Sequence, residues 1–149
     1  MTLKSALASS RNIPAIKMFF AVGGEEIFVK FLRSIGINSI QESGDYYGRP
    51  ISIGAAEMQL LELVKAYSHL SAFGKPAEVN PILEVRASDG SILYKKQVKT
   101  VDQVIPSGVA YLVWEMLSNS ANMPASWIST FTYPGIKFAV KTGTTNVKK

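Results

Sequence analysis

The sequence predicts one α/β (α+β) domain in which helices accompany antiparallel strands. Three observations indicate this class. Apolar residues recur at three- and four-residue spacing in several segments, Asp89-Gly90 separates two strand-like runs, and residues 136–141 alternate with a two-residue period. The 149 residues, of which 47% are hydrophobic and 18% charged, suffice for one globular core. Without a repeat or a linker in the sequence, we expect residues 1–149 to form a single domain.

The first third of the chain predicts helices separated by polar turns. Their expected ranges are 2–8, 14–23 and 25–35. Thr2 can cap the first helix, Pro14 suits the first turn of the second, and Gly36 can close the third in a left-handed conformation. Repeated glycines together with Pro50 then indicate an irregular surface connection over residues 38–54.

The middle of the chain predicts a helix followed by a hairpin. Over residues 58–73 the apolar side chains form one helical stripe, which we expect to be buried: Leu60, Leu63, Val64, Tyr67 and Leu70. His69 lies off that stripe and is expected to be solvated. Residues 81–86 and 91–96 predict two strands joined by a turn at Asp89-Gly90.

The last third predicts a helix, a loop and a strand. Apolar residues at helical spacing follow Pro106 and predict the helix. Residues 118–135 are rich in Asn, Pro and Gly and are expected to be loop. Residues 136–141 predict a half-exposed strand, which leads directly into Lys141-Thr142-Gly143.

Composition and charge limit the kinds of partner. The net charge of +5 favours anionic partners, but the basic residues are scattered, so we expect no nucleic-acid partner. The absence of cysteine excludes disulfides and thiolate metal sites, and no cofactor or metal is expected. Polar residues interrupt the first turns, so no secretory signal opens the chain. Any export signal or membrane anchor is therefore expected upstream of Met1.

Two short motifs carry the candidate chemistry, although each is weak alone. Ser10-Arg11-Asn12 lies in a predicted turn between two helices, and Lys141-Thr142-Gly143 lies at the end of a predicted strand. Taken singly, both are better explained by local capping and turn formation. Their order matches serine acyl-transfer enzymes that use Ser-x-x-Lys, then Ser-x-Asn, then Lys-Thr-Gly.

The similarity extends beyond these motifs. Residues 2–15 resemble the segment around Ser-x-Asn in class A penicillin-binding proteins, and Ile53-Gly54 with residues 57–67 resembles the helix that follows it. Residues 141–146, Lys-Thr-Gly-Thr-Thr-Asn, resemble the class A form of the last motif. The chain is thus similar to the C-terminal part of a penicillin-binding transpeptidase domain. That resemblance implies a β-lactamase/transpeptidase-like antiparallel sheet flanked by helices, incomplete at both ends.

The resemblance also implies a peptidoglycan D,D-transpeptidase site. Ser10 would relay a proton to the departing amine, Asn12 would orient the substrate backbone, and Lys141 would supply positive charge facing Ser10. The family's substrates are stem peptides ending in D-Ala-D-Ala, and β-lactams bind at the same place. The expected location is the extracytoplasmic face of the bacterial plasma membrane.

The substrate-binding residues implied by the resemblance follow Lys141. The hydroxyls of Thr142 and Thr144 would bind the terminal carboxylate, and the Thr144 N–H would complete an oxyanion hole. Gly143 would leave room for the substrate along the strand edge.

The family's nucleophile is absent from this sequence. No lysine has a serine three residues before it, so the Ser-x-x-Lys pair is missing. We therefore expect this chain alone to be inactive. Three alternatives remain open: a non-catalytic pseudoenzyme or binding protein of the same fold, a D,D-carboxypeptidase or serine β-lactamase relative, and a basic nucleic-acid binder. An in-frame Ser-x-x-Lys upstream of Met1 would favour the transpeptidase over the pseudoenzyme.

Overall fold

Helices dominate the computed structural model, which describes residues 1–97 and 102–144. The α-helices are α1 (Leu3–Ala8), α2 (Asn12–Ala21), α3 (Gly24–Ser34), α4 (Gly44–Tyr47), α5 (Leu60–Ser71), α6 (Ser107–Ser118) and α7 (Ala125–Phe131). Short 3₁₀ helices are η1 (Arg49–Ile53) and η2 (Ser120–Asn122), and the strands are β1 (Glu84–Arg86) and β2 (Ile92–Lys95). The mixed class predicted from the sequence is confirmed.

Local signals set the ends of the first three helices. The Thr2 hydroxyl accepts a hydrogen bond from the Ser5 N–H at 3.3 Å and caps α1. Gly36 follows α3 with a φ of 91°, a left-handed conformation that glycine adopts without strain. Both expectations are confirmed, and α2 begins two residues before Pro14.

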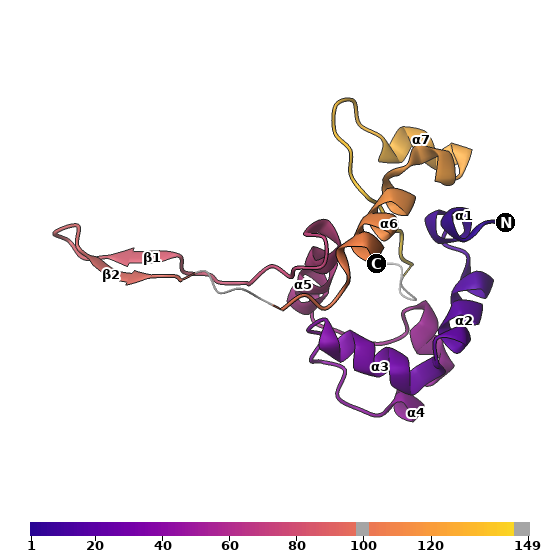
Figure 1. Ribbon diagram of the computed structural model, residues 1–149, viewed down its shortest axis with the longest axis horizontal. Coiled ribbons are helices and arrows are strands. Elements are labelled where there is room, and N and C mark those ends of the chain that lie inside the picture. The colour runs from indigo at the N-terminus through magenta and orange to yellow at the C-terminus, as the bar shows by residue number, and fades with distance from the viewer. Residues whose placement is uncertain (98–101, 145–149) are drawn as a thin grey trace.

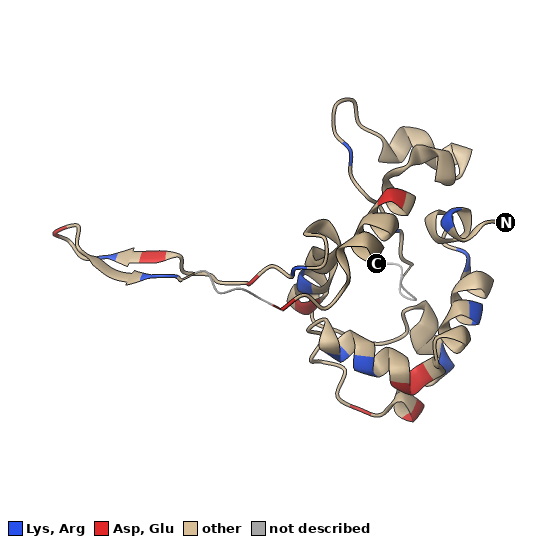
Figure 2. Cartoon of the chain, viewed as in Figure 1, with Lys and Arg blue, Asp and Glu red and all other residues tan. Residues whose placement is uncertain are grey.

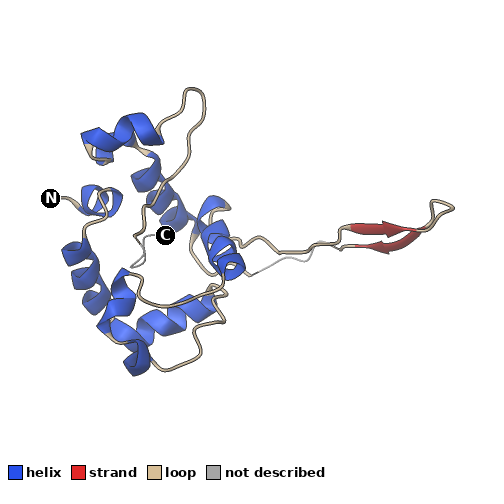
Figure 3. Ribbon diagram, turned by 180° about the vertical axis from the view of Figure 1, so that it is seen from behind, coloured by secondary structure: helices blue, strands red, loops and turns tan. Residues whose placement is uncertain are grey.

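The helices follow one another around a ring in the ribbon view (Figure 1), and the same arrangement is seen from behind (Figure 3). Helix α1 packs against both α2 and α6, although α6 lies about a hundred residues further along the chain. Helix α5 in turn packs against α6. The two ends of the described chain are therefore brought to one region, which is where the sequence motifs lie.

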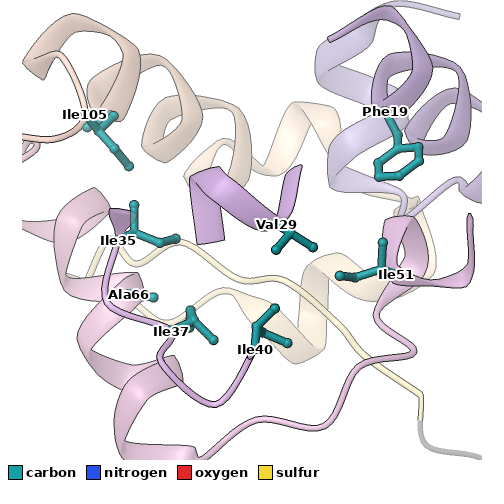
Figure 4. Packing of buried hydrophobic residues seen from close by; sticks show 9 residues of the cluster. Phe19, Val29, Ile35, Ile37, Ile40, Ile51, Ala66 and Ile105 are labelled. Atoms are coloured by element: carbon teal, nitrogen blue, oxygen red, sulfur yellow. The ribbon is translucent and has the colours of Figure 1, made fainter. Parts of the chain in front are cut away.

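Isoleucines outside the α-helices make up five of the nine residues of the hydrophobic core. Figure 4 shows most of the buried cluster, which consists of Phe19, Val29, Ile35, Ile37, Ile40, Ile51, Ala66, Ile105 and Ala110. The guanidinium of Arg33 donates to the Ile40 and Glu42 carbonyl oxygens at 2.7 and 2.8 Å and fixes the turn after α3. The predicted irregular connection 38–54 is thus wrong in part, because the segment forms α4 and η1 and buries the side chains of Ile40 and Ile51. Its glycines and its proline indicated an exposed loop instead.

The predicted buried stripe of α5 is wrong in part, since only Leu63 and Leu70 of its five residues are half-buried, and Leu70 packs against the core. Leu60, Val64 and Tyr67 are exposed, and Leu60 retains 76% of its surface. Ala66 and His69 are buried instead, and His69 is only 2% exposed, contrary to the expected solvated histidine. The reason is tertiary: the turn around Ile37 and Ile40 together with α6 covers the opposite side of the helix.

The hairpin is confirmed, but helices do not flank it. Strands β1 and β2 pair antiparallel, with Glu84 opposite Lys95 and Val85 opposite Tyr94. Gly90 adopts a φ of 85° in the turn, as the Asp-Gly signal predicts. Every residue of both strands is exposed, and the pair projects away from the helices (Figures 1 and 3). Within the described residues the expected helix-flanked sheet is therefore absent.

Two expectations for the last third are wrong. The predicted loop 118–135 contains η2 and α7. The predicted strand 136–141 forms only an isolated bridge between Tyr133 and Ile136 and pairs with no strand of the described chain. A strand requires a partner for its backbone groups, whereas here the Val140 N–H donates to the Leu117 carbonyl oxygen of α6 at 3.2 Å.

Candidate functional site

Ser10 occupies a sharp turn between α1 and α2. Its N–H donates to the Leu7 carbonyl oxygen and the Arg11 N–H donates to the Ala6 carbonyl oxygen, at 3.1 and 3.0 Å. These bonds close the C-terminus of α1 and require a left-handed residue, a position most often filled by glycine. Ser10 fills it with a φ of 54°, which is uncommon for a non-glycine residue. The turn thus holds the Ser10 hydroxyl at a fixed position between two helices.

Lys141 reaches Ser10 from the other end of the chain. Its Nζ donates to the Ser10 Oγ at 2.6 Å, across 131 positions of sequence, and to the Thr142 carbonyl oxygen at 2.8 Å. These two short bonds fix the ammonium group over the α1–α2 turn. The two motifs singled out from the sequence are therefore joined by a direct contact.

The two segments that carry this contact have charged residues of one sign. Residues 1–24 and 116–144 contain no Asp or Glu, and their basic residues are Lys4, Arg11, Lys17, Lys137 and Lys141. Figure 2 shows the acidic residues on other parts of the chain, one of them on α6. Partial burial lowers the pKa of Lys141 below that of an ordinary lysine. No carboxylate of the described chain pairs with Lys141, so its positive charge is available to an anionic ligand.

The other predicted site residues surround this pair less closely. Asn12 is the first residue of α2 and is exposed, with no side-chain hydrogen bond inside the described chain. Thr142 is half-buried, and Gly143 and Thr144 are exposed. A Cβ added to Gly143 would meet no atom within 4 Å, so the space beside it is open. Thr145 and Asn146, which completed the class A form of the motif, lie outside the described residues.

Sequence reasoning missed an apolar wall beside Thr142. A shallow depression is lined by Ala8, Met123, Trp127, Phe131, Val140 and Thr142. Trp127 and Phe131 come from α7, and their rings meet edge to face with centroids 6.1 Å apart. The available signal was their four-residue spacing directly after Pro124, which is typical of a helix with one apolar face.

The family model described as "Penicillin binding protein transpeptidase domain" matches residues 1–149. The chain belongs to this transpeptidase family. This transpeptidase-family chain is 26% identical over 148 residues to penicillin-binding protein 1B of Escherichia coli (strain K12), with 97% of the chain covered. It is 27% identical over 147 residues to penicillin-binding protein 1A/1B of Bacillus subtilis (strain 168), with 98% covered. It is also 25% identical over 146 residues to penicillin-binding protein 1B of Buchnera aphidicola, with 97% covered.

The chain spans only a small part of these relatives. The matched region is 16% of the Escherichia coli and Bacillus subtilis proteins and 19% of the Buchnera protein. Within the described residues of this transpeptidase-family chain, no helix is long and apolar enough to cross a bilayer. The same residues contain no cluster of three or more His, Asp or Glu side chains suited to a metal ion.

Proposed function

We propose that this chain forms the Ser-x-Asn and Lys-Thr-Gly side of a class A peptidoglycan D,D-transpeptidase site. One observation carries the proposal: Lys141 Nζ lies 2.6 Å from Ser10 Oγ, although the two motifs are separated by almost the whole chain. Family membership supports this reaction class and, with it, our proposal of a β-lactamase/transpeptidase-like fold.

The proposed roles of Ser10 and Lys141 follow from their contact. In the reaction, a serine attacks the carbonyl carbon of the D-Ala-D-Ala bond, and the departing D-Ala amine takes up a proton. A hydroxyl that accepts a hydrogen bond from an ammonium group can donate its own proton to that amine. The lysine ammonium then returns a proton to the hydroxyl oxygen. Ser10 is the proposed relay, and Lys141 is the proposed proton source and electrostatic partner.

The remaining site residues are proposed to bind the substrate. Asn12 would orient the substrate backbone, because its exposed amide stands at the start of α2 beside Ser10. The Thr142 and Thr144 hydroxyls would hold the terminal carboxylate, and the Thr144 N–H would stabilise the oxyanion. Open space beside Gly143 leaves room for an extended peptide. The absence of acidic residues in segments 1–24 and 116–144 supports an anionic ligand.

The acyl-enzyme requires a nucleophile that this sequence does not contain. No serine lies three residues before a lysine, so the chain alone is proposed to bind stem peptides and β-lactams without being acylated. The family also supports a role in cell-wall synthesis, on the extracytoplasmic face of the bacterial plasma membrane.

Binding of a short D-Ala-D-Ala peptide tests the proposal. We expect addition of Nα,Nε-diacetyl-Lys-D-Ala-D-Ala to shift the amide NMR signals of Ser10, Thr142 and Gly143 in the 149-residue chain. The matched peptide ending in L-Ala-L-Ala is the control, and mass spectrometry after incubation with a fluorescent penicillin should show no covalent adduct. Equal shifts with both peptides would remove the proposed specificity, and an adduct would show that the chain carries its own nucleophile.

A non-catalytic binding role is the second candidate, favoured by the same missing Ser-x-x-Lys pair. The DNA upstream of the codon for Met1 discriminates between the two. An in-frame Ser-x-x-Lys there supports the transpeptidase, and an intact gene without one supports the binding protein.

A further inference from the structure

The segment that carries Lys141 lacks the support of a sheet. Residues 137–144 belong to no strand, and the Val140 N–H donates to the Leu117 carbonyl oxygen at the end of α6. The side chains of Val140 and Thr142 both line the apolar depression. In an extended segment, neighbouring side chains point to opposite sides, so Lys141 is directed away from that depression and meets Ser10.

Helix α7 is half-buried only where it meets this segment. Trp127 and Phe131 are its only half-buried side chains, its other five residues are exposed, and both rings line the depression with Val140 and Thr142. Helix α7 has no extensive packing contact with another helix or strand of the described chain. The half-buried face of α7 thus lines the depression beside Ala8 and the Lys141 segment, and no residue of α7 belongs to the main buried cluster.

The same end of α6 anchors both α7 and the Lys141 segment. Asn122, which is buried, donates from Nδ2 to the Met116 carbonyl oxygen at 3.1 Å and fixes η2, which leads into α7. The neighbouring carbonyl oxygen, that of Leu117, holds Val140. Ala8, two residues before Ser10, completes the depression. The depression is thus lined by residues from both segments that carry the Ser10–Lys141 contact.

We propose that Met123, Trp127 and Phe131 form a positioning wall that holds Lys141 against Ser10. The wall lines the same depression as Val140 and Thr142 and would act on the ammonium group through them, so its members are positioning residues. This inference extends the proposed function, since it names what orients the Lys-Thr-Gly segment. The effect of the wall on Lys141 can nevertheless be measured without any substrate.

The environment of the Lys141 ammonium reports this positioning. Partial burial lowers its pKa, and segments 1–24 and 116–144, which carry the contact, contain no carboxylate. Glu115 lies in the last turn of α6 and accepts a hydrogen bond from the Asn119 Nδ2 at 2.9 Å. The charged residues on those segments are all basic: Lys4, Arg11, Lys17 and Lys137. If the wall is removed, the ammonium should become more solvated and its pKa should rise towards the ordinary lysine value.

The test is an NMR titration of the Lys141 side chain in the 149-residue chain, with the signal assigned by Lys141→Arg. We expect Trp127→Ala and Phe131→Ala to raise the Lys141 pKa, and Ile128→Ala, which lies on the same helix but outside the depression, to leave it unchanged. Helix content is followed by circular dichroism in each variant.

If Trp127→Ala does not fold, Phe131→Ala carries the test. Trp127→Leu keeps an apolar side chain in the wall and should preserve most of the shift. An unchanged Lys141 titration in folded Trp127→Ala or in folded Phe131→Ala would overturn the proposal, as would an equal change in Ile128→Ala. Because no substrate is present, failure here is distinct from failure to bind D-Ala-D-Ala.

Discussion

Lys141 and Ser10 share a 2.6 Å hydrogen bond although 131 positions separate them. The turn that holds Ser10 is built from α1 and α2, and α1 packs on α6, whose last turn holds Val140 beside Lys141. The contact therefore depends on the packing of both ends of the chain. The contact also places one cation between segments 1–24 and 116–144, which contain no Asp or Glu.

Replacing Lys141 should weaken binding of a D-Ala-D-Ala peptide about tenfold, because a charge-assisted hydrogen bond contributes about 1.5 kcal/mol. Lys141→Ala is compared with Lys17→Ala, which removes an exposed charge of the same sign from α2. Titration of the peptide by NMR provides both affinities. An equal loss in the two variants would mean that only the general positive field attracts the ligand.

Acid should destabilise the chain through Glu62. The Ser39 hydroxyl and N–H donate to Glu62 Oε2 at 2.6 and 3.0 Å and lower the pKa of this carboxyl. A carboxyl with a lowered folded-state pKa stabilises the fold above its unfolded pKa, about 4.3, and loses this contribution as the pH falls through the folded value. Urea unfolding between about pH 6 and 3 should therefore show a flatter acid dependence in Glu62→Gln.

Two further variants check the origin of this acid dependence. Ser39→Ala removes the hydroxyl donor and should flatten the profile in part, whereas Glu57→Gln, at an exposed position, should reproduce the wild-type profile. A Glu62→Gln profile parallel to the wild type would assign the acid sensitivity to another group.

Signals that act within a few residues were readable from the sequence. The Thr2 cap, the left-handed Gly36 and the Asp89-Gly90 turn each depend on local backbone chemistry, and each is confirmed. The motif positions were also readable, since a turn between helices at Ser10 follows from capping residues. The direct contact between Ser10 and Lys141 was an expectation taken from the family, and the structure places the two side chains in contact.

Features that depend on distant neighbours could not be predicted. The buried side of α5 is set by the residues packed on it, so the more apolar face, with Leu60 and Val64, is the exposed one. The alternation in 136–141 allows a strand but cannot supply the neighbouring strand that completes it. Helix α7 was not predicted because Asn, Pro and Gly are frequent in residues 118–135, although Trp127 and Phe131 are four residues apart, as on one face of a helix.

A methyl group added at Gly44 should destabilise the chain by about 1–3 kcal/mol, the usual cost of overpacking. The new Cβ would lie 2.6 Å from the Glu26 backbone nitrogen and 2.7 Å from the Glu25 carbonyl carbon, and α3 would have to move away. Gly108 is the matched control, because it also lies in the first turn of a helix, and a Cβ there meets nothing within 4 Å.

Gly108→Ala should be neutral or stabilising by up to about 1 kcal/mol, since alanine favours the helix more than glycine does. Urea midpoints followed by circular dichroism give both values. A Gly44→Ala midpoint equal to that of Gly108→Ala would contradict the close packing of α4 on α3.

His69→Leu should leave stability unchanged or raise it by about 1 kcal/mol. His69 is buried on α5, and its Nδ1 has no hydrogen-bond partner among residues 1–97 and 102–144. A buried polar atom without a partner carries a desolvation cost that an apolar side chain of similar size avoids. The control is Asn122→Leu, because Asn122 is also buried but donates to the Met116 carbonyl oxygen, and its loss should cost about 1–3 kcal/mol. A lower urea midpoint for His69→Leu, comparable to that of Asn122→Leu, would indicate that the imidazole is satisfied in solution by a water molecule or another group.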